Sequence, residues 1–386
     1  MDGPADSTVH DPVAPATDYA PVAHEIEQRD AAAFVHVGDR FDDHLRYLTR
    51  FQGPDRPYGV CYLDEPVCFP PVLFESDARE ALPDARIESP DDRHPAERIV
   101  AFLRERGVDG TVLTPRSIPH DAARYLETGG FDVASTDALD RARRRKSGAE
   151  LERIETVQAA ARTGMDRARG VLQDAVADGD VLHYEGEPLT TERLRRAVDG
   201  AMAAEGVDPA RNTVIGAGPS CADLHYRGVD RIAPDETVLL DLSPRGPAGY
   251  YGDFTRTFVP DLEDGWARRA HVAVERAREA AFAVLEEGAG VTAADVHREA
   301  AAEIAAYGFE PDGEPGFTHG VGHGIGLSLH ERPSMRASET LLAGDVVTIE
   351  PGVYDADRGG VRIEDVVVVE EAGIRVLGDY PTSLRP

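Results

Sequence analysis

Residues 238–259 have the sequence VLLDLSPRGPAGYYGDFTRTFV. An apolar run ends in Asp241, the glycine- and proline-rich segment 243–249 can only form a turn, and an extended run resumes at Tyr250. A hairpin of this kind brings Asp241 and Asp253 side by side at one end of a sheet. A single buried aspartate is usually a turn cap or half of an ion pair. Two that are paired by a hairpin are more typical of metal ligands.

A second pair of acids repeats the arrangement. Residues 346–352 (VVTIEPG) end a predicted strand in Glu350, and Gly359-Gly360 begins the return through residues 361–369 (VRIEDVVVV). Period-two alternation predicts that Arg362 and Glu364 share one face of this strand. Burial of Glu364 among valines is costly unless a cation or Arg362 compensates its charge. An internal ion pair between Arg362 and Glu364 is therefore the alternative to a metal.

Three histidines separated by glycines lie between these pairs, in residues 317–331 (FTHGVGHGIGLSLHE). They are His319, His323 and His330, and the glycines suit a close approach of the backbone to a metal or a substrate. A phosphate-binding loop is disfavoured because the segment lacks the P-loop lysine and the spacing G-x-G-x-x-G. His225 stands alone in its segment, which by itself is more typical of a structural histidine.

Four carboxylates and one imidazole are hard and borderline ligands that suit a pair of divalent cations. Without cations the cluster would repel itself, since two carboxylates about 4 Å apart cost roughly 4 kcal/mol at an effective dielectric constant of 20. These residues therefore predict a two-metal hydrolase.

Composition limits the class of protein. The 386 residues suffice for two domains, and the net charge of −30 argues against nucleic acid as a partner. No apolar run approaches the ~20 residues of a membrane span, the polar N-terminus lacks the regions of a signal peptide, and three cysteines are too few for a disulfide framework. We expect a cytoplasmic protein with buried thiols. Abundant acids with one lysine, Lys146, indicate a halophilic source.

Residues 1–20 are expected to form a mobile tail. Predicted strands at 32–37, 59–63, 67–69 and 110–113 alternate with helices at 97–106 and 120–127, which indicates an α/β domain over 21–140. The basic run 141–146 is interpreted as a solvated linker at the domain boundary. A second domain over 147–386 begins with a long helix at 149–174 and continues with helices near 190–204, 263–287 and 292–306.

Taken together, the four acids and His323 resemble the ligand set of the pita-bread metallopeptidase family. This family includes methionine aminopeptidase, Xaa-Pro aminopeptidase, prolidase and the metal-free creatinase. The resemblance covers residues 147–386. It implies an α+β pita-bread catalytic domain preceded by a creatinase-like α/β domain. The metal-ligand positions that it implies are Asp241, Asp253, His323, Glu350 and Glu364.

Finer matches resemble the Xaa-Pro aminopeptidase and prolidase branch. Residues 350–354 read EPGVY, as in that branch, and Arg362 precedes the last ligand by two residues. The resemblance implies catalytic roles for Glu350, His225 and His330, and substrate contacts for His319, Tyr354 and Arg362. One departure is the spacing of twelve between Asp241 and Asp253, where the family commonly has eleven. The additional residue falls in the turn.

The resemblance implies hydrolysis of the Xaa-Pro peptide bond by two divalent ions, with Mn²⁺ expected and Co²⁺ or Zn²⁺ as alternatives. Asp253 and Glu364 would bridge the ions, and Glu350 would transfer the proton. The expected partners are a peptide with proline in the second position and a second copy of the chain. Two alternatives stay open: a creatinase-like hydrolase of a non-peptide C–N bond, and a non-catalytic binding protein. Aminopeptidase and dipeptidase activities are not distinguished.

Overall fold

The computed structural model describes residues 15–261 and 265–386. The chain divides into two compact units, one reaching Ala142 and including Ser147–Glu150, the other comprising Arg143–Lys146 and Leu151–Pro386. Among the described helices, none combines the length and the apolar character that a membrane span requires.

The first unit is built on a six-stranded mixed sheet in the order β4-β3-β2-β1-β5-β6. The strands are β1 (Ala33–Gly38), β2 (Tyr58–Tyr62), β3 (Pro66–Phe69), β4 (Arg86–Ile87), β5 (Thr111–Pro115) and β6 (Asp132–Thr136). Its helices are α1 (Ala20–Gln28), α2 (Asp43–Thr49), α3 (Glu75–Ala81), α4 (Pro95–Glu105), α5 (His120–Thr128) and α6 (Ala138–Arg144). The predicted α/β fold of this unit is confirmed, as are its predicted strands and helices.

Local sequence explains where these helices begin. Helix α4 starts at Pro95, whose missing N–H is harmless in the first turn, and His94 and Glu97 form a capping box around it. Ile99, Phe102 and Leu103 then cover the sheet together with residues of α5. Helices α1, α2, α3 and α6 and strands β4 and β6 were not predicted. The expected tail falls mainly on residues 1–14, outside the described residues, whereas Tyr19 donates a hydrogen bond to Leu48 O at 2.6 Å.

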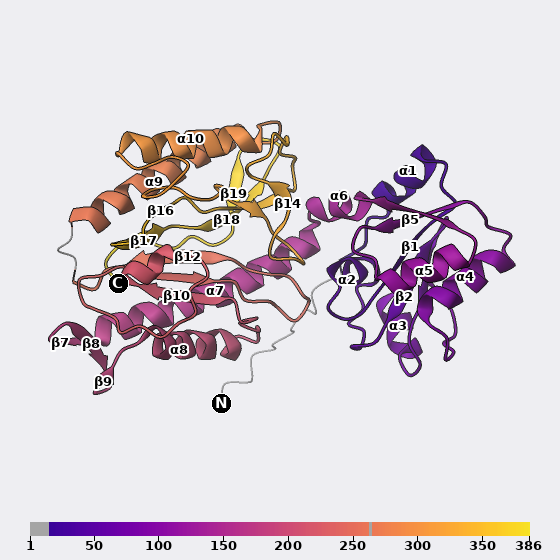
Figure 1. Cartoon of the computed structure of the whole chain (residues 1–386), viewed down its shortest axis with the longest axis horizontal. Helices are drawn as coiled ribbons and strands as arrows, with labels where there is room; N and C mark the ends of the chain where they lie inside the picture. The colour runs from indigo at the N-terminus through magenta and orange to yellow at the C-terminus, as the bar shows by residue number, and fades with distance from the viewer. Residues whose placement is uncertain (1–14, 262–264) are drawn as a thin grey trace, which may run out of the picture. The chain divides into compact units, whose positions relative to one another are not determined.

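The second unit opens with the predicted long helix α7 (Gly148–Asp174), followed by α8 (Thr191–Ala204), α9 (Gly265–Leu285) and α10 (Ala293–Ala306). Thr292 caps α10 by accepting a hydrogen bond from Asp295 N at 3.1 Å. Val296, Ala300 and Ile304 recur every four residues on its buried face. These helices were predicted, and α9 and α10 lie on one side of the strands while α7 and α8 lie on the other (Figure 1).

Two main sheets lie between these helix pairs. One is β10-β11-β12, formed by Thr213–Ala217, Val238–Leu242 and Phe254–Phe258. The other is β14-β13-β15-β18-β19, formed by Glu331–Ser334, His323–Gly324, Val346–Ile349, Asp365–Val369 and Ile374–Val376. A hairpin of β16 (Gly352–Asp355) and β17 (Gly359–Arg362), a short sheet of β7 (Val176–Asp178), β8 (Val181–Tyr184) and β9 (Glu187–Pro188), and a 3-10 turn at Gly218–Ala222 complete the unit.

The single strand predicted over residues 361–369 is wrong. The chain leaves one pairing at Arg362 and enters another at Asp365, because β17 pairs with β16 whereas β18 pairs with β15. Ile363 and Glu364 lie in the break between them. The alternation of valine and isoleucine is correct for each half, but it carries no signal for the change of partner.

The basic run 141–146 is not the solvated linker that the sequence suggested. Arg143 and Lys146 are only 6% and 7% exposed, and Arg145 forms a backbone bridge to Asp345. Arg144 pairs with Asp345 at 2.6 Å. The acidic partners lie about two hundred positions later in the sequence, so a charge run that looks solvated is neutralised by folding.

Candidate metal centre

Asp241 and Asp253 lie at one end of the β11–β12 hairpin. Asp241 is opposite Thr255 in the register of the two strands, and Asp253 immediately precedes β12. The Ser243 hydroxyl donates to Asp253 Oδ1 at 2.9 Å and lies 3.4 Å from Asp241 Oδ1. The turn between the strands closes through Gly252 N and Pro244 O at 3.0 Å. It accommodates the additional residue while both acids face one pocket.

Helix α7 fixes Asp253 from the other side. Gln158 accepts a hydrogen bond from Asp253 N at 2.7 Å and donates one to Asp253 O at 3.0 Å. Gln158 is 2% exposed, so this bidentate contact is shielded from water. Gln158 does not bind the Asp253 carboxylate, which faces the pocket.

His323 comes from β13, next to the strand that leads to Glu350. Its backbone N–H donates to Thr348 Oγ1 at 3.0 Å, and that hydroxyl donates to Glu350 Oε1 at 3.2 Å. His323 Nδ1 lies 3.1 Å from Gly324 O, which leaves Nε2 as the free ligand atom. His323 Nε2 lies 3.5 Å from Asp253 Oδ2 and 3.4 Å from Glu350 Oε1.

Glu364 sits in the break between β17 and β18. Its Oε2 accepts a hydrogen bond from Thr255 Oγ1 at 2.6 Å, and its backbone N–H donates to Thr255 O at 3.1 Å. Among the described residues, Arg362 does not form the ion pair with Glu364 that the sequence left as the alternative to a metal. Arg362 instead pairs with Asp241 at 2.6 Å.

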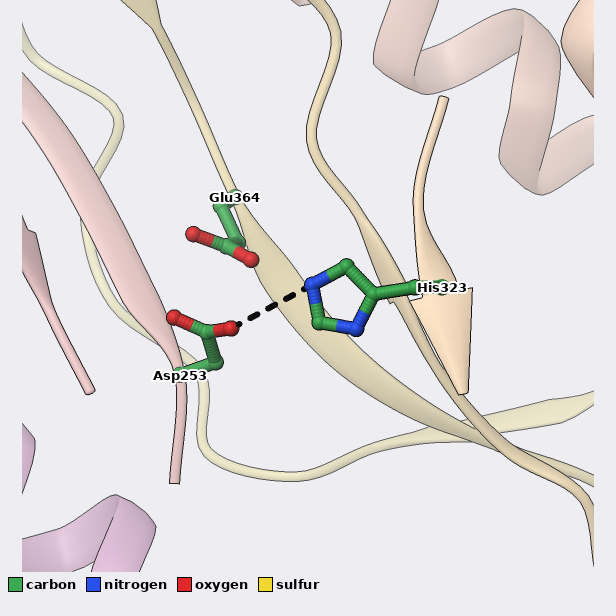
Figure 2. Close-up of side chains that lie close together, drawn as sticks. All are labelled: Asp253, His323 and Glu364. Atoms are coloured by element: carbon green, nitrogen blue, oxygen red, sulfur yellow. Dashed lines mark ion pairs between the residues drawn. The ribbon is translucent and has the colours of Figure 1, made fainter. Parts of the chain in front are cut away.

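Three of the predicted ligands meet at one point. One ligand atom each of Asp253, His323 and Glu364 lies within 4.8 Å of the others. Figure 2 shows the three side chains pointing toward one another. Asp241 and Glu350 line the same pocket, which has a volume of about 470 Å³. The structure thus brings together all five residues that the sequence singled out, from segments between positions 241 and 364.

The electrostatics of this cluster favour a cation. Burial first, and then Glu364, Asp241 and Glu350, hold the pKa of Asp253 well above its usual range. Burial raises the pKa of Glu364 to about 8 and that of Glu350 to about 7. Burial also lowers the pKa of His323, which keeps its imidazole neutral as a metal ligand must be. A bound dication would compensate the carboxylates and lower their pKa values. The donor set therefore fits divalent metal ions.

The other predicted histidines lie around the same pocket. His319, His225 and His330 line it, and the rings of His330 and His323 have centroids 4.2 Å apart. Partial desolvation in the pocket, with His323 and His225 nearby, lowers the pKa of His330 to about 4, and burial lowers that of His319 to about 3. Both nitrogens of His319 are engaged, Nδ1 with Gly320 O at 2.7 Å and Nε2 with the Tyr354 hydroxyl at 2.8 Å.

Tyr354 is 1% exposed and is not among the residues that line the pocket. It accepts a hydrogen bond from Arg362 Nη1 at 2.9 Å and contacts His319. The chain His319–Tyr354–Arg362–Asp241 thus joins a pocket histidine to a predicted ligand through buried groups.

Sequence reasoning missed several residues that support the site. Ser243, Thr255, Thr348 and Gln158 form hydrogen bonds to the predicted ligands. Besides Arg362, three more arginines line the pocket: Arg211, Arg227 and Arg336. Each of the three hydroxyl residues lies two positions from a predicted ligand, and Thr255 also lies opposite Asp241 in the strand pair. This spacing could have identified them once the candidate ligands were chosen. The arginines follow no spacing that the sequence reveals.

Comparisons with known proteins agree with this arrangement. The chain is 31% identical over 259 residues to the "Probable dipeptidase PepE" of Mycobacterium bovis, a match that spans 66% of this chain and 64% of that protein. It is 29% identical over 371 residues to the "Putative dipeptidase YkvY" of Bacillus subtilis, covering 93% and 96% of the two chains. It is 36% identical over 209 residues to the "Xaa-Pro dipeptidase" of Pyrococcus furiosus, covering 52% and 58%.

Solved structures show the same fold. The Xaa-Pro dipeptidase from Bacillus anthracis superposes with a TM-score of 0.83 at 19% identity, covering 95% of this chain and 98% of that one. The dipeptidase PepE from Mycobacterium ulcerans gives a TM-score of 0.75 at 29% identity, covering 95% of each. An N-terminal domain followed by a pita-bread domain, as predicted, is confirmed. The model of metallopeptidase family M24 matches residues 152–371, and the chain belongs to that family.

Proposed function

We propose that the chain hydrolyses the peptide bond before a proline, using two divalent ions held by Asp241, Asp253, His323, Glu350 and Glu364. The observation that carries the proposal is the convergence of these five donors on one pocket. The activities named for the relatives from Bacillus subtilis and Pyrococcus furiosus support a peptidase and, for the latter, proline specificity.

Asp253 and Glu364 are the proposed shared ligands. Asp241 would complete the site of one ion, and His323 and Glu350 that of the other. This oxygen-rich set with one imidazole favours Mn²⁺, with Co²⁺ or Zn²⁺ as alternatives. When bound, the ions would lower the pKa of water and polarise the scissile carbonyl.

The side chains of the pocket supply the remaining chemistry. Glu350, whose side chain is 15% exposed beside His323, would accept a proton from the attacking water and pass it to the leaving nitrogen. His225 or His330 would donate a hydrogen bond to the oxygen on which negative charge develops. His319 and Arg362, which line the pocket, would contact the substrate, and Arg362 would also hold Asp241. Tyr354, which the resemblance implied as a substrate contact, lies behind the pocket and would instead hold the His319 ring.

Hydrolysis of Xaa-Pro dipeptides and Xaa-Pro-Yaa tripeptides with added Mn²⁺ at high salt tests the proposal. We expect cleavage by the wild type and loss of cleavage in Glu350→Ala, while Glu371→Ala, which removes an exposed carboxylate, retains it. The preferred length separates dipeptidase from aminopeptidase. A protein that holds two metals but cleaves neither peptide contradicts proline specificity, and one that binds no metal supports a binding protein.

The resemblance also supports a homodimer. Light scattering of the purified chain should give a mass near twice 41.7 kDa. The acidic surface further predicts that this mass and the activity hold better in molar salt than in dilute buffer.

A further inference from the structure

A buried cluster of charges in the second unit involves Lys146, the only lysine of the chain. Its ammonium lies 2.6 Å from Glu331 Oε1, and Arg143 Nη2 lies 2.6 Å from Glu331 Oε2. The three side chains are 1%, 6% and 9% exposed, in the order Lys146, Arg143, Glu331. Removal of ions from water to this degree costs several kcal/mol each, so such a cluster is weak evidence for stability. It calls for another reason.

The segment 326–331 folds around the Glu331 carboxylate. Arg143 Nη2 also donates to Ser328 Oγ at 2.6 Å, and Ser328 N lies 3.4 Å from Glu331 Oε2. A Cβ at Gly326 would lie 2.3 Å from Glu331 Oε1 and 3.0 Å from Lys146 Cε, so the backbone passes directly against the ion pair. One carboxylate and its two cations therefore fix the segment at both ends.

This segment carries Leu329 and His330, which line the pocket. His330 is exposed, and within the described part of the chain its ring makes no hydrogen bond. Its ring lies against that of His323, at 4.2 Å between centroids. The place of the His330 ring in the pocket is therefore set mainly by the backbone of residues 326–331.

We propose that Glu331, held by Lys146 and Arg143, is a positioning residue that fixes His330 in the pocket. The proposal rests on the proposed role of His330 toward the substrate. A misplacement of about 1 Å can cost about a hundredfold in rate. Glu331→Gln should accordingly lower kcat roughly ten- to a hundredfold, because the neutral amide holds the two cations, and hence the segment, less firmly.

The chain provides a matched control in a second buried ion pair from the same basic run. Arg144 binds Asp345 at 2.6 and 2.8 Å, and Asp345 is 0% exposed. Asp345 also accepts a hydrogen bond from Leu342 N, outside segment 326–331. Asp345→Asn should reduce stability about as much as Glu331→Gln without moving His330.

A double-mutant cycle separates the two cases. If Glu331 acts through His330, Glu331→Gln lowers kcat in the wild type but changes it less than twofold in a His330→Ala background. Asp345→Asn should have the same effect in both backgrounds. Equal effects of Glu331→Gln in the two backgrounds would overturn the proposal. Should Glu331→Gln fail to fold, Lys146→Met replaces it, with recovery expected in Lys146→Arg.

Two measurements need no substrate and distinguish failure of this inference from failure of the proposed function. Amide hydrogen exchange across residues 326–331 should become faster in Glu331→Gln and not in Asp345→Asn. The ring C–H resonances of His330, assigned by comparison with His330→Ala, should shift in Glu331→Gln only. Unchanged exchange and unchanged resonances would refute positioning, whether or not a peptide is cleaved.

Discussion

At the scale of single residues, burial raises the pKa of three predicted metal ligands: Asp253, Glu350 and Glu364. In the metal-free folded protein they retain protons that the unfolded chain releases above about pH 4. The unfolded state then binds fewer protons, so their contribution to the free energy of unfolding falls as pH rises from about 4 to about 8. Metal binding requires the release of these protons, so metal affinity rises with pH over the same interval.

We expect the stabilisation by Mn²⁺ to grow from pH 6 to pH 8. The measurement is the difference in Tm between metal-loaded and chelator-treated protein at each pH. Comparing the same chain with and without metal cancels the titration of acids outside the site. A difference that stays constant or shrinks with pH would show that these carboxylates do not release protons to the metal.

The hydroxyl of Thr255 gives a second prediction at this scale. It donates to Glu364 at 2.6 Å in a buried setting, and loss of such a partner typically weakens metal affinity about 10- to 100-fold. Thr255→Val should show this loss in calorimetric titration with Mn²⁺. Thr237→Val is the matched control, since among the described residues the buried Thr237 hydroxyl has no partner. Equal affinities of the two variants would contradict the assignment.

The candidate ligands could be predicted from the sequence because an acid at the end of an apolar strand is unusual. Its burial requires a compensating cation, which indicates a metal site. Thr255 and Thr348 could not be predicted in this way, because threonine is a common strand residue and its hydroxyl becomes informative only when its partner is known. Gln158 lies on a helix 95 positions before the backbone it binds.

At the scale of secondary-structure elements, the close approach of strands β13 and β15 places His323 beside Glu350. A Cβ at Gly322 would lie 1.9 Å from Thr348 O, so any side chain there must separate the strands. At Gly320 the nearest atom to such a Cβ is Arg336 Cγ at 3.1 Å, the middle of a flexible side chain. Glycine is thus required at position 322, whereas position 320 can accept a small side chain.

Gly322→Ala should therefore lower Tm by several degrees and weaken Mn²⁺ binding by more than about tenfold, through strain in the β13–β15 pair. Gly320→Ala should change both far less. Thermal unfolding and metal titration of the two variants provide the check, and a harmless Gly322→Ala would contradict the strand arrangement around His323.

Elements were predicted well where their periodicity is local and poorly where a partner changes. Helices α7 and α10 follow from caps and spacing alone. The break at Ile363–Glu364 does not, because β17 and β18 look like one alternating strand and differ only in what lies beside them. That break is what turns Glu364 toward the pocket.

At the scale of the whole molecule, charge is unevenly distributed. The net charge is −30, yet Arg211, Arg227 and Arg336 line the pocket. Within the described residues, Arg211 and Arg227 form no ion pair of their own, whereas Arg336 pairs with Asp312 at 2.9 Å. Arg211 and Arg227 thus offer guanidinium groups at the wall of the pocket, in addition to its four acids, and such groups suit an anionic group of a ligand.

We expect peptides with a free C-terminal carboxylate to bind better than their amides. KM for an Xaa-Pro dipeptide should be lower than for its amide, and Arg211→Met with Arg227→Met should reduce this difference severalfold. Arg298→Met, on the exposed face of α10, is the control. An unchanged ratio in the double variant would assign carboxylate recognition elsewhere. The sequence alone could not show that these arginines line one pocket, because they come from three separate segments.

Lys146 carries the only side-chain amine of the chain, and that amine is 1% exposed. Reagents that acylate or cross-link lysine side chains will therefore find no exposed lysine on the folded protein, although the chain has 41 basic residues. Trypsin will behave as an enzyme that cuts after arginine at every other site. The rate of acylation at Lys146 would then report how often the segment around Glu331 opens, and the mass increment on the peptide that contains Lys146 would measure that rate.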